Sequence, residues 1–140
     1  MPSTVAGIGL TRQQRVRATI AFIAISARRQ DIAMQKQSFA KLDVLVCDPN
    51  QQMGTLIGQM LRHLKVHAVE EVQSTNAALN SLTNRKFGVI LLDDQLGPTD
   101  SVELIRALRA NENGLNRMTP VVMMSSAPEA ARILAARDAG

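Results

Sequence analysis

The chain has 140 residues, which is enough for one compact domain with a hydrophobic core and too few for two ordinary domains. Apolar residues make up 46% of the chain and charged residues 20%, a globular balance, and no apolar run approaches the roughly 20 residues that a membrane span needs. A single cysteine excludes an intrachain disulfide, and three phenylalanines without tyrosine or tryptophan argue against single-stranded nucleic-acid binding.

The positive charge of the chain is concentrated near its start. Residues 1–41 hold seven Lys and Arg against one Asp, whereas residues 42–140 hold nine bases and eleven acids. We therefore expect residues 1–40 to form a basic extension and residues 41–140 to form the folded domain. The apolar segment 18–27 lies within this extension. The favoured interpretation is a partly helical or disordered extension; the alternatives are a surface-binding amphipathic helix and a signal peptide.

From residue 41 onward, short apolar runs alternate with helical periodicity. Strands are expected at 42–47, 66–69, 87–92 and 120–124, and helices at 53–64, at 75–84, from 100 onward and toward 139. Asn50, Asp100 and Ser126 stand where helix caps belong. The alternating order predicts an α/β fold, with a parallel sheet covered by helices on both faces.

Polar residues follow three of the expected strands. Asp48 follows the first strand, Asp93 the third and Ser125 the fourth. Because the carboxyl ends of parallel strands meet at one edge of a sheet, we expect these side chains to lie together. Clustered carboxylates suit Mg²⁺, and a carboxylate can also attack phosphorus to give an acyl phosphate. Asp93, which follows the most apolar strand, is the strongest candidate for a functional acid.

These segments resemble the receiver domains of two-component response regulators. The resemblance covers residues 42–140 and rests on LDVLVCDPN (42–50), VILLDDQLGPTD (89–100), PVVMMSS (120–126) and AARDAG (135–140). It implies a doubly wound, flavodoxin-like fold and a signalling role in the cytoplasm rather than an enzymatic one. It further implies that a histidine kinase or phosphotransfer protein phosphorylates Asp93, and that the phosphoprotein then contacts a downstream protein.

The resemblance also implies roles for the neighbouring residues. Asp48, Asp93 and the backbone carbonyl of Gln95 would hold Mg²⁺, and the hydroxyl of Ser125 would sense the phosphoryl group. Pro49 stands where the family has a second acid, so the expected Mg²⁺ site is weak. The family also continues into a fifth strand with an essential lysine and a fifth helix, so we expect an incomplete (βα)4 form of the usual (βα)5 domain.

Other functions remain open at this point. A degenerate receiver or fragment could act as a phosphorylation-independent interaction module, which the replacement of an acid by Pro49 favours. An aspartate-dependent phosphohydrolase is disfavoured, because Gln95 occupies the place of the second Asp in its DxD pattern. Binding to nucleic acid or to a membrane is not expected. One of three outcomes is expected instead: residues 18–27 cover the first helix, the chain self-associates through the apolar surface beside the exposed edge at 121–124, or the domain is only marginally stable.

Several chemically suggestive residues have a structural interpretation. His63 and His67 do not share a helical face, so no metal site is expected there. Cys47 lies in an apolar strand and is interpreted as a core residue. Gly54 and Gly58 lower the helix propensity of their segment, which indicates a close approach by another element.

Overall fold

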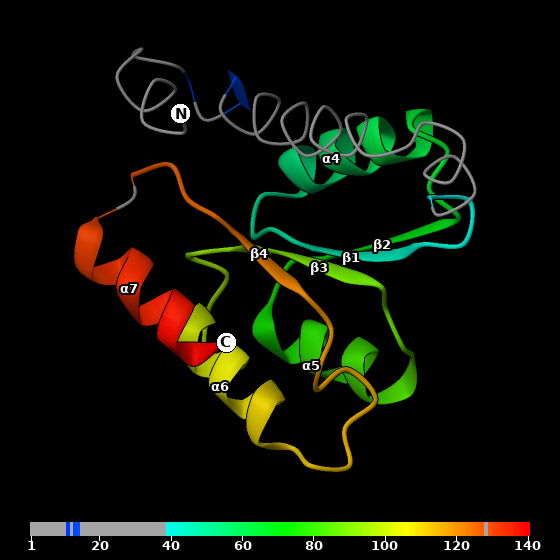
Figure 1. Cartoon of the computed structure of the whole chain (residues 1–140). Helices are drawn as coiled ribbons and strands as arrows, with labels where there is room; N and C mark the ends of the chain where they lie inside the picture. Colours follow the sequence, from blue (N-terminus) through cyan, green and yellow to red (C-terminus); the bar gives the residue numbers. More distant parts are fainter. Residues whose placement is uncertain (1–10, 12, 15–38, 128) are drawn as a thin grey trace, which may run out of the picture.

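The computed structural model describes residues 11, 13–14, 39–127 and 129–140. The elements in chain order are β1 (Asp43–Cys47), α4 (Gln51–His63), β2 (Ala68–Val72), α5 (Thr75–Asn84), β3 (Val89–Asp93), α6 (Ser101–Ala110), β4 (Val121–Met124) and α7 (Ala130–Ala139). The four strands form one parallel sheet in the order β2-β1-β3-β4 (Figure 1). The predicted α/β class and the four strand–helix units are therefore confirmed.

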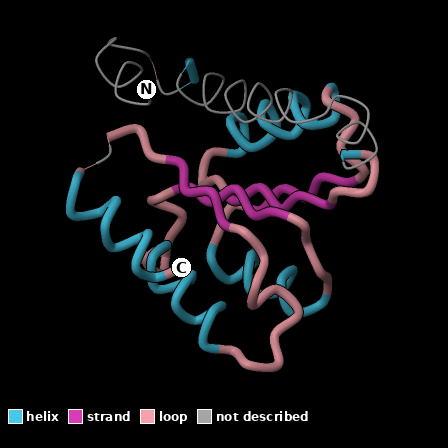
Figure 2. Tube along the Cα trace, viewed as in Figure 1, coloured by secondary structure: helices cyan, strands magenta, loops and turns pink. Residues whose placement is uncertain are grey.

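The sheet lies between two layers of helices. Figure 2 shows α4 on one face and α5, α6 and α7 on the other. Successive side chains of a strand point to opposite faces, so Val44 and Val46 pack beneath α4 while Leu45 joins the larger core on the other side. All three of these side chains are completely buried. Such double-sided burial explains why the central strands read as continuous apolar runs.

The second strand differs from its expected position. The structure places it at Ala68–Val72 rather than 66–69, and it includes two acidic residues. Both acids have partners on neighbouring elements: Glu71 pairs with Arg62 at 3.0 Å, and Glu70 contacts Ser81 and Arg85. Because β2 is an edge strand of the described sheet, its polar side chains reach partners at the rim, and an apolar pattern alone misplaces it.

Helix caps were predicted correctly at two positions and wrongly at a third. Asn50 Oδ1 accepts the N–H of Met53 at 3.2 Å at the start of α4, and Asp100 caps α6 through its carboxylate. The predicted cap at Ser126 is wrong, since α7 begins only at Ala130 and Glu129 occupies its N-cap position. Ser126 and Ala127 form a bend rather than a first helical turn.

A buried amide attaches the loop between α6 and β4 to the body of the domain. Asn116 is completely buried. Its Nδ2 donates to the carbonyls of Leu82 and Arg85, both at 2.7 Å, and its Oδ1 accepts from the N–H of Phe87 at 2.8 Å and from Thr119 Oγ1 at 3.1 Å. Three of these hydrogen bonds link the loop, which looks like a polar surface segment in the sequence, to residues outside it.

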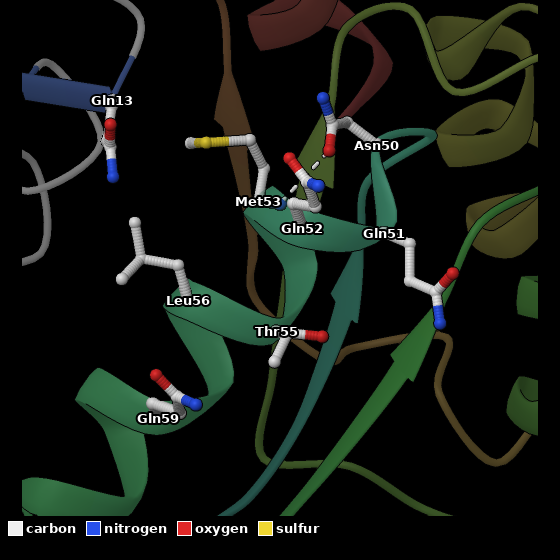
Figure 3. A pocket seen from close by; sticks show the side chains of 8 residues that line it. All are labelled: Gln13, Asn50, Gln51, Gln52, Met53, Thr55, Leu56 and Gln59. Atoms are coloured by element: carbon white, nitrogen blue, oxygen red, sulfur yellow. Dashed lines mark hydrogen bonds between the residues drawn. The ribbon is translucent and has the colours of Figure 1, made fainter.

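The expectations for the basic extension fall almost entirely outside the described residues, and this includes the segment 18–27. Of the described residues there, Gln13 lines a shallow pocket of about 550 Å³ together with the amino-terminal half of α4, including Met53 and Leu56 (Figure 3). Among the described helices, none has the length and apolar character needed to cross a bilayer.

Candidate functional site

Two buried carboxylates lie at the carboxyl edge of the sheet. Cys47 pairs with Leu92 in the β1–β3 register, so the next residues along the two strands, Asp48 and Asp93, fall side by side. Asp48 is 1% exposed and Asp93 is 4% exposed. Carboxylates are rarely buried to this extent without a specific role or partner. The structure thus brings together Asp48 and Asp93, the two acids that were predicted to meet because each stands at the end of a strand.

Each of these carboxylates is oriented by its own turn. Asp48 Oδ1 accepts the N–H of Asn50 at 2.8 Å, and Asp93 Oδ1 accepts the N–H of Gln95 at 2.8 Å. In both turns the donor lies two residues after the acid, so the N–H of the residue in between is not needed for this hydrogen bond to the carboxylate. Pro49, which has no N–H, is therefore compatible with the turn that orients Asp48.

The other two predicted site residues lie beside the acids. Asp93 pairs with Met124 across β3 and β4, so Ser125 is the next residue beyond that pair. Its hydroxyl accepts the N–H of Ala127 at 3.3 Å and, as a hydroxyl, can donate a further hydrogen bond. Gln95 is exposed and lines a pocket of about 410 Å³ formed by the loop after β3.

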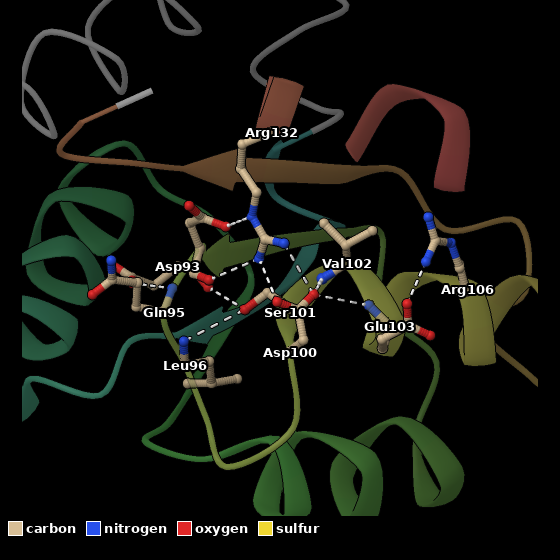
Figure 4. A network of polar contacts seen from close by, with 10 residues as sticks. Asp93, Gln95, Leu96, Asp100, Ser101, Val102, Glu103, Arg106 and Arg132 are labelled. Carbon is tan, nitrogen blue, oxygen red and sulfur yellow. Dashed lines mark hydrogen bonds and ion pairs between the residues drawn. The ribbon is translucent and has the colours of Figure 1, made fainter. Parts of the chain in front are cut away.

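The loop after β3 is held by the start of α6. Ser101, which is completely buried, donates through Oγ to the carbonyl of Asp93 at 2.7 Å and accepts the N–H of Leu96 at 3.4 Å (Figure 4). A single hydroxyl therefore fixes the backbone on both sides of Gln95. Ser101 was not among the predicted site residues, because nothing in the sequence shows that its side chain faces back into the loop.

An arginine from α7 also reaches this loop. Arg132 contacts Asp94, the residue after Asp93, and Asp100, the cap of α6 (Figure 4). Hydrogen bonds to Asp100 and Asp94 raise the pKa of the Arg132 guanidinium, so it keeps its positive charge. Burial acts to raise the pKa of Asp100, but its bonds from Arg132 and from the N–H groups of Glu103 and Val102 lower it overall. Arg132 was not among the predicted site residues, although a cation in the first turn of a helix opposes the helix dipole and is therefore an informative signal.

Cys47 and His67 each interact with neighbouring groups of the fold. Burial, with smaller effects from the charges of Glu70 and Asp48, raises the pKa of the Cys47 thiol to about 12, so the thiol stays protonated in the core. His67 Nδ1 lies 2.7 Å from Asp43 Oδ1, where the histidine pairs with a strand residue. Across the described residues, no group of three His, Cys, Asp or Glu side chains could hold a metal ion. A cation at the sheet edge would therefore need backbone oxygens or water beside Asp48 and Asp93.

Solved structures with a similar fold provide a comparison for the whole domain. The chemotaxis response regulator CheY4 of Vibrio cholerae aligns over 71% of this chain and 81% of its own, with a TM-score of 0.64 and 19% identity. A response regulator receiver protein from Pseudomonas putida aligns over 71% of this chain and 80% of its own, with a TM-score of 0.64 and 20% identity. At these identities the structures establish the fold, which is the expected doubly wound, flavodoxin-like receiver fold.

A third similar structure is a Burkholderia pseudomallei response regulator that carries a phosphorylated aspartic acid, a calcium ion and citrate. It shares 22% identity and a TM-score of 0.64 over 71% of this chain and 56% of its own. At the level of sequence, the model of the response regulator receiver domain family matches residues 44–140, from the second residue of β1 to the last residue of the chain. The chain therefore belongs to the response regulator receiver domain family.

Proposed function

We propose that this chain is the phosphoryl-accepting component of a two-component phosphorelay and that Asp93 is the acceptor. The observation that carries the proposal is the placement of Asp93: it ends the buried strand β3, is 4% exposed and lies beside the buried Asp48. Its backbone is held by Ser101 and its carboxylate by the N–H of Gln95. An acceptor needs this kind of orientation, because phosphoryl transfer depends mainly on positioning and charge.

The donor would be a phosphohistidine of a histidine kinase or phosphotransfer protein. A carboxylate oxygen of Asp93 attacks phosphorus, the new P–O bond forms, and the P–N bond to the imidazole breaks. The departing imidazole nitrogen takes up a proton, and Asp93 becomes an acyl phosphate. The hydroxyl of Ser125, one residue beyond the end of β4, would donate a hydrogen bond to a phosphoryl oxygen.

The donor atoms at the sheet edge fit a divalent cation such as Mg²⁺. Asp48 and Asp93 supply buried carboxylate oxygens, and Gln95 supplies a backbone carbonyl, all hard oxygen ligands. A bound cation would neutralise charge between the carboxylates and the phosphoryl oxygens. Pro49 contributes no ligand beside Asp48, so we expect weaker binding than a site with three carboxylates would show.

A protein partner would recognise the phosphorylated domain, and this chain would not itself catalyse a downstream reaction. We place this signalling in the cytoplasm.

A second function is favoured by one observation. With Pro49 in place of an acid, the domain could instead act as a phosphorylation-independent interaction module. The two functions differ in one measurable property, which is whether Asp93 is ever phosphorylated.

The test is labelling with acetyl phosphate and Mg²⁺, followed by mass spectrometry of the intact chain. Wild type should gain one phosphoryl group, Asp93→Asn should gain none, and Asp94→Asn should keep the ability to be labelled. Label that persists in Asp93→Asn and disappears in Asp94→Asn would move the acceptor by one residue. Wild type that resists both acetyl phosphate and a phosphorylated histidine donor would favour the interaction module.

A further inference from the structure

Arg132 of α7 contacts a loop that lies 32 to 38 residues earlier in the sequence. Its Nε lies 2.5 Å from Asp94 Oδ1, and its Nη2 donates to the Asp94 carbonyl at 3.3 Å. Its Nη1 and Nη2 also face the two carboxylate oxygens of Asp100, at 3.1 and 2.9 Å. The guanidinium of one α7 residue therefore binds both ends of the loop 94–100, which follows the proposed acceptor (Figure 4).

The position of Arg132 is unfavourable for its own helix. It is the third residue of α7, where the helix dipole favours anions, and the first turn of α7 contains no acidic residue. Its N-cap residue, Glu129, makes no capping hydrogen bond through its side chain. The interactions that hold Arg132 here are therefore those with Asp94 and Asp100, outside α7.

The pair with Asp94 is shielded from solvent. The Asp94 side chain is 13% exposed and that of Arg132 is 30% exposed, whereas the Arg137–Asp138 pair on the same helix is 72% and 66% exposed. Shielded ion pairs are screened less by water and salt than exposed ones. Removal of Arg132 would leave the Asp94 charge uncompensated directly beside Asp93.

We infer that Arg132 is a positioning residue for phosphorylation: it fixes the loop 94–100 between α6 and α7 and neutralises Asp94 next to the acceptor Asp93. This inference rests on the proposed function. A phosphoryl group adds about two negative charges at Asp93, which an uncompensated neighbouring carboxylate would repel. Among the described residues, the ion pairs of both Asp94 and Asp100 are formed with Arg132.

The first experiment compares initial rates of labelling by acetyl phosphate at saturating Mg²⁺. Arg132→Gln should be slower than wild type by about tenfold, because the uncompensated charge of Asp94 lies near the protein surface on the residue next to the acceptor. Arg137→Gln, which removes the same charge from the same helix, should label like wild type. The double variant Arg132→Gln/Asp94→Asn should recover most of the rate, because it removes the repelling charge together with its partner.

Recovery of the labelling rate in the double variant would show that Arg132 acts by compensating the charge of Asp94. A general loss of structure in Arg132→Gln would not be repaired by Asp94→Asn. If Arg132→Gln is labelled at the wild-type rate, Arg132 does not neutralise Asp94 for phosphorylation. The same conclusion follows if the double variant is labelled as slowly as Arg132→Gln. Thermal unfolding of each variant shows whether a slow rate reflects unfolded protein. Arg132→Lys, which keeps the charge but loses the forked geometry, should fall between wild type and Arg132→Gln.

The second experiment does not depend on phosphorylation. Amide hydrogen exchange of residues 94–100 should be faster in Arg132→Gln than in wild type, and unchanged in Arg137→Gln. Unchanged exchange in Arg132→Gln would overturn the positioning role whether or not the chain is ever phosphorylated. If the loop loosens as expected but wild type is never labelled, the proposed function fails while the structural role of Arg132 stands.

Discussion

Asp48 and Asp93 orient their carboxylates with the same local hydrogen bond, from the N–H two residues later to Oδ1, at 2.8 Å in both turns. The residue between acid and donor differs: it is Pro49 in the first turn and Asp94 in the second. Position 49 therefore carries no acid beside Asp48, whereas position 94 carries one beside Asp93, and Arg132 pairs with it. This distribution of charge underlies the expectation for metal binding.

Restoring an acid at position 49 should strengthen divalent-cation binding. Pro49→Asp adds a carboxylate beside Asp48, in a turn that does not use the N–H of residue 49. We expect a tighter dissociation constant for Mg²⁺, since an additional carboxylate raises the affinity of an oxygen-ligand site. Titration calorimetry on wild type and variant measures the change, and unfolding experiments on both account for the loss of proline.

Gln51→Asp is the matched control for that experiment. It adds the same charge two residues further along, at the exposed first position of α4. It should change Mg²⁺ affinity much less than Pro49→Asp does. Equal effects of the two variants would mean that only the general negative potential matters, and that residue 49 does not face the site.

Loss of the buried amide in the α6–β4 loop should destabilise the whole domain. Asn116→Ala leaves the N–H of Phe87 and the carbonyls of Leu82 and Arg85 without their side-chain partner. A buried unsatisfied group costs about 1–3 kcal/mol, so we expect the free energy of unfolding to fall by about 3 kcal/mol. Urea denaturation followed by circular dichroism measures this.

Asn113→Ala in the same loop is the control, because Asn113 is exposed. Its free energy of unfolding should stay within about 0.5 kcal/mol of wild type. A comparably small effect for Asn116→Ala would show that water replaces the amide and that the loop is not anchored as described.

An acid-dependent contribution to stability is expected from Asp43. Hydrogen bonds from His67 and then Arg85 lower the pKa of the Asp43 carboxyl below its usual value of 3.8 in the folded state. The ionised form is therefore favoured by folding, and its contribution is complete above the unfolded-state pKa and lost as pH falls through the folded-state pKa. Asp43→Asn should be less stable than wild type near neutral pH, and the difference should shrink as the pH drops below about 3.8.

Thermal melts of both proteins over this pH range measure the effect. Asp138→Asn serves as the control, because its exposed pair with the adjacent Arg137 contributes little. A stability gap between Asp43→Asn and wild type that stayed constant down to the acid end of the range would contradict this role for the carboxylate.

The predictable parts of this molecule are those that depend on local pattern. Apolar runs located β1 and β3, and helical periodicity together with Asn50 located α4. The acids at the ends of adjacent parallel strands could be brought together from topology alone, because strand ends share one edge. These inferences need only the pattern of residues close together in the sequence and the rule that the carboxyl ends of parallel strands lie at the same edge of a sheet.

Contacts between distant segments could not be predicted in this way. Arg132 lies 38 residues from Asp94, and Asn116 lies 29 residues from Phe87. Neither residue differs in type from ordinary surface polar residues, so only the folded structure shows what it binds. The acidic strand β2 was misplaced for the same reason, since its acids are tolerated because of partners such as Arg62.

Gly54 and Gly58 of α4 provide the last prediction, since the structure distinguishes two glycines that look equivalent in the sequence. A Cβ added at Gly54 would have Asp48 Cβ as its nearest neighbour, at 4.0 Å, whereas a Cβ at Gly58 would overlap Oε1 of Glu71. The close approach expected from these glycines therefore occurs at Gly58. There the carboxylate of Glu71, from β2, lies against α4 and pairs with Arg62 at 3.0 Å.

Gly54→Ala should raise the free energy of unfolding by up to about 1 kcal/mol, because alanine is the better helix former and finds ordinary contact distances there. Gly58→Ala gains the same helix propensity but must displace Glu71 from its ion pair and from Thr55 Oγ1, so its net effect should be neutral or destabilising. Adding Glu71→Ala to Gly58→Ala removes the overlap, and the penalty for alanine at position 58 should then disappear. Urea denaturation of the three variants, with Glu71→Ala alone as reference, provides the comparison. Equal stabilisation by Gly54→Ala and Gly58→Ala would show that the Glu71 side chain does not lie against α4.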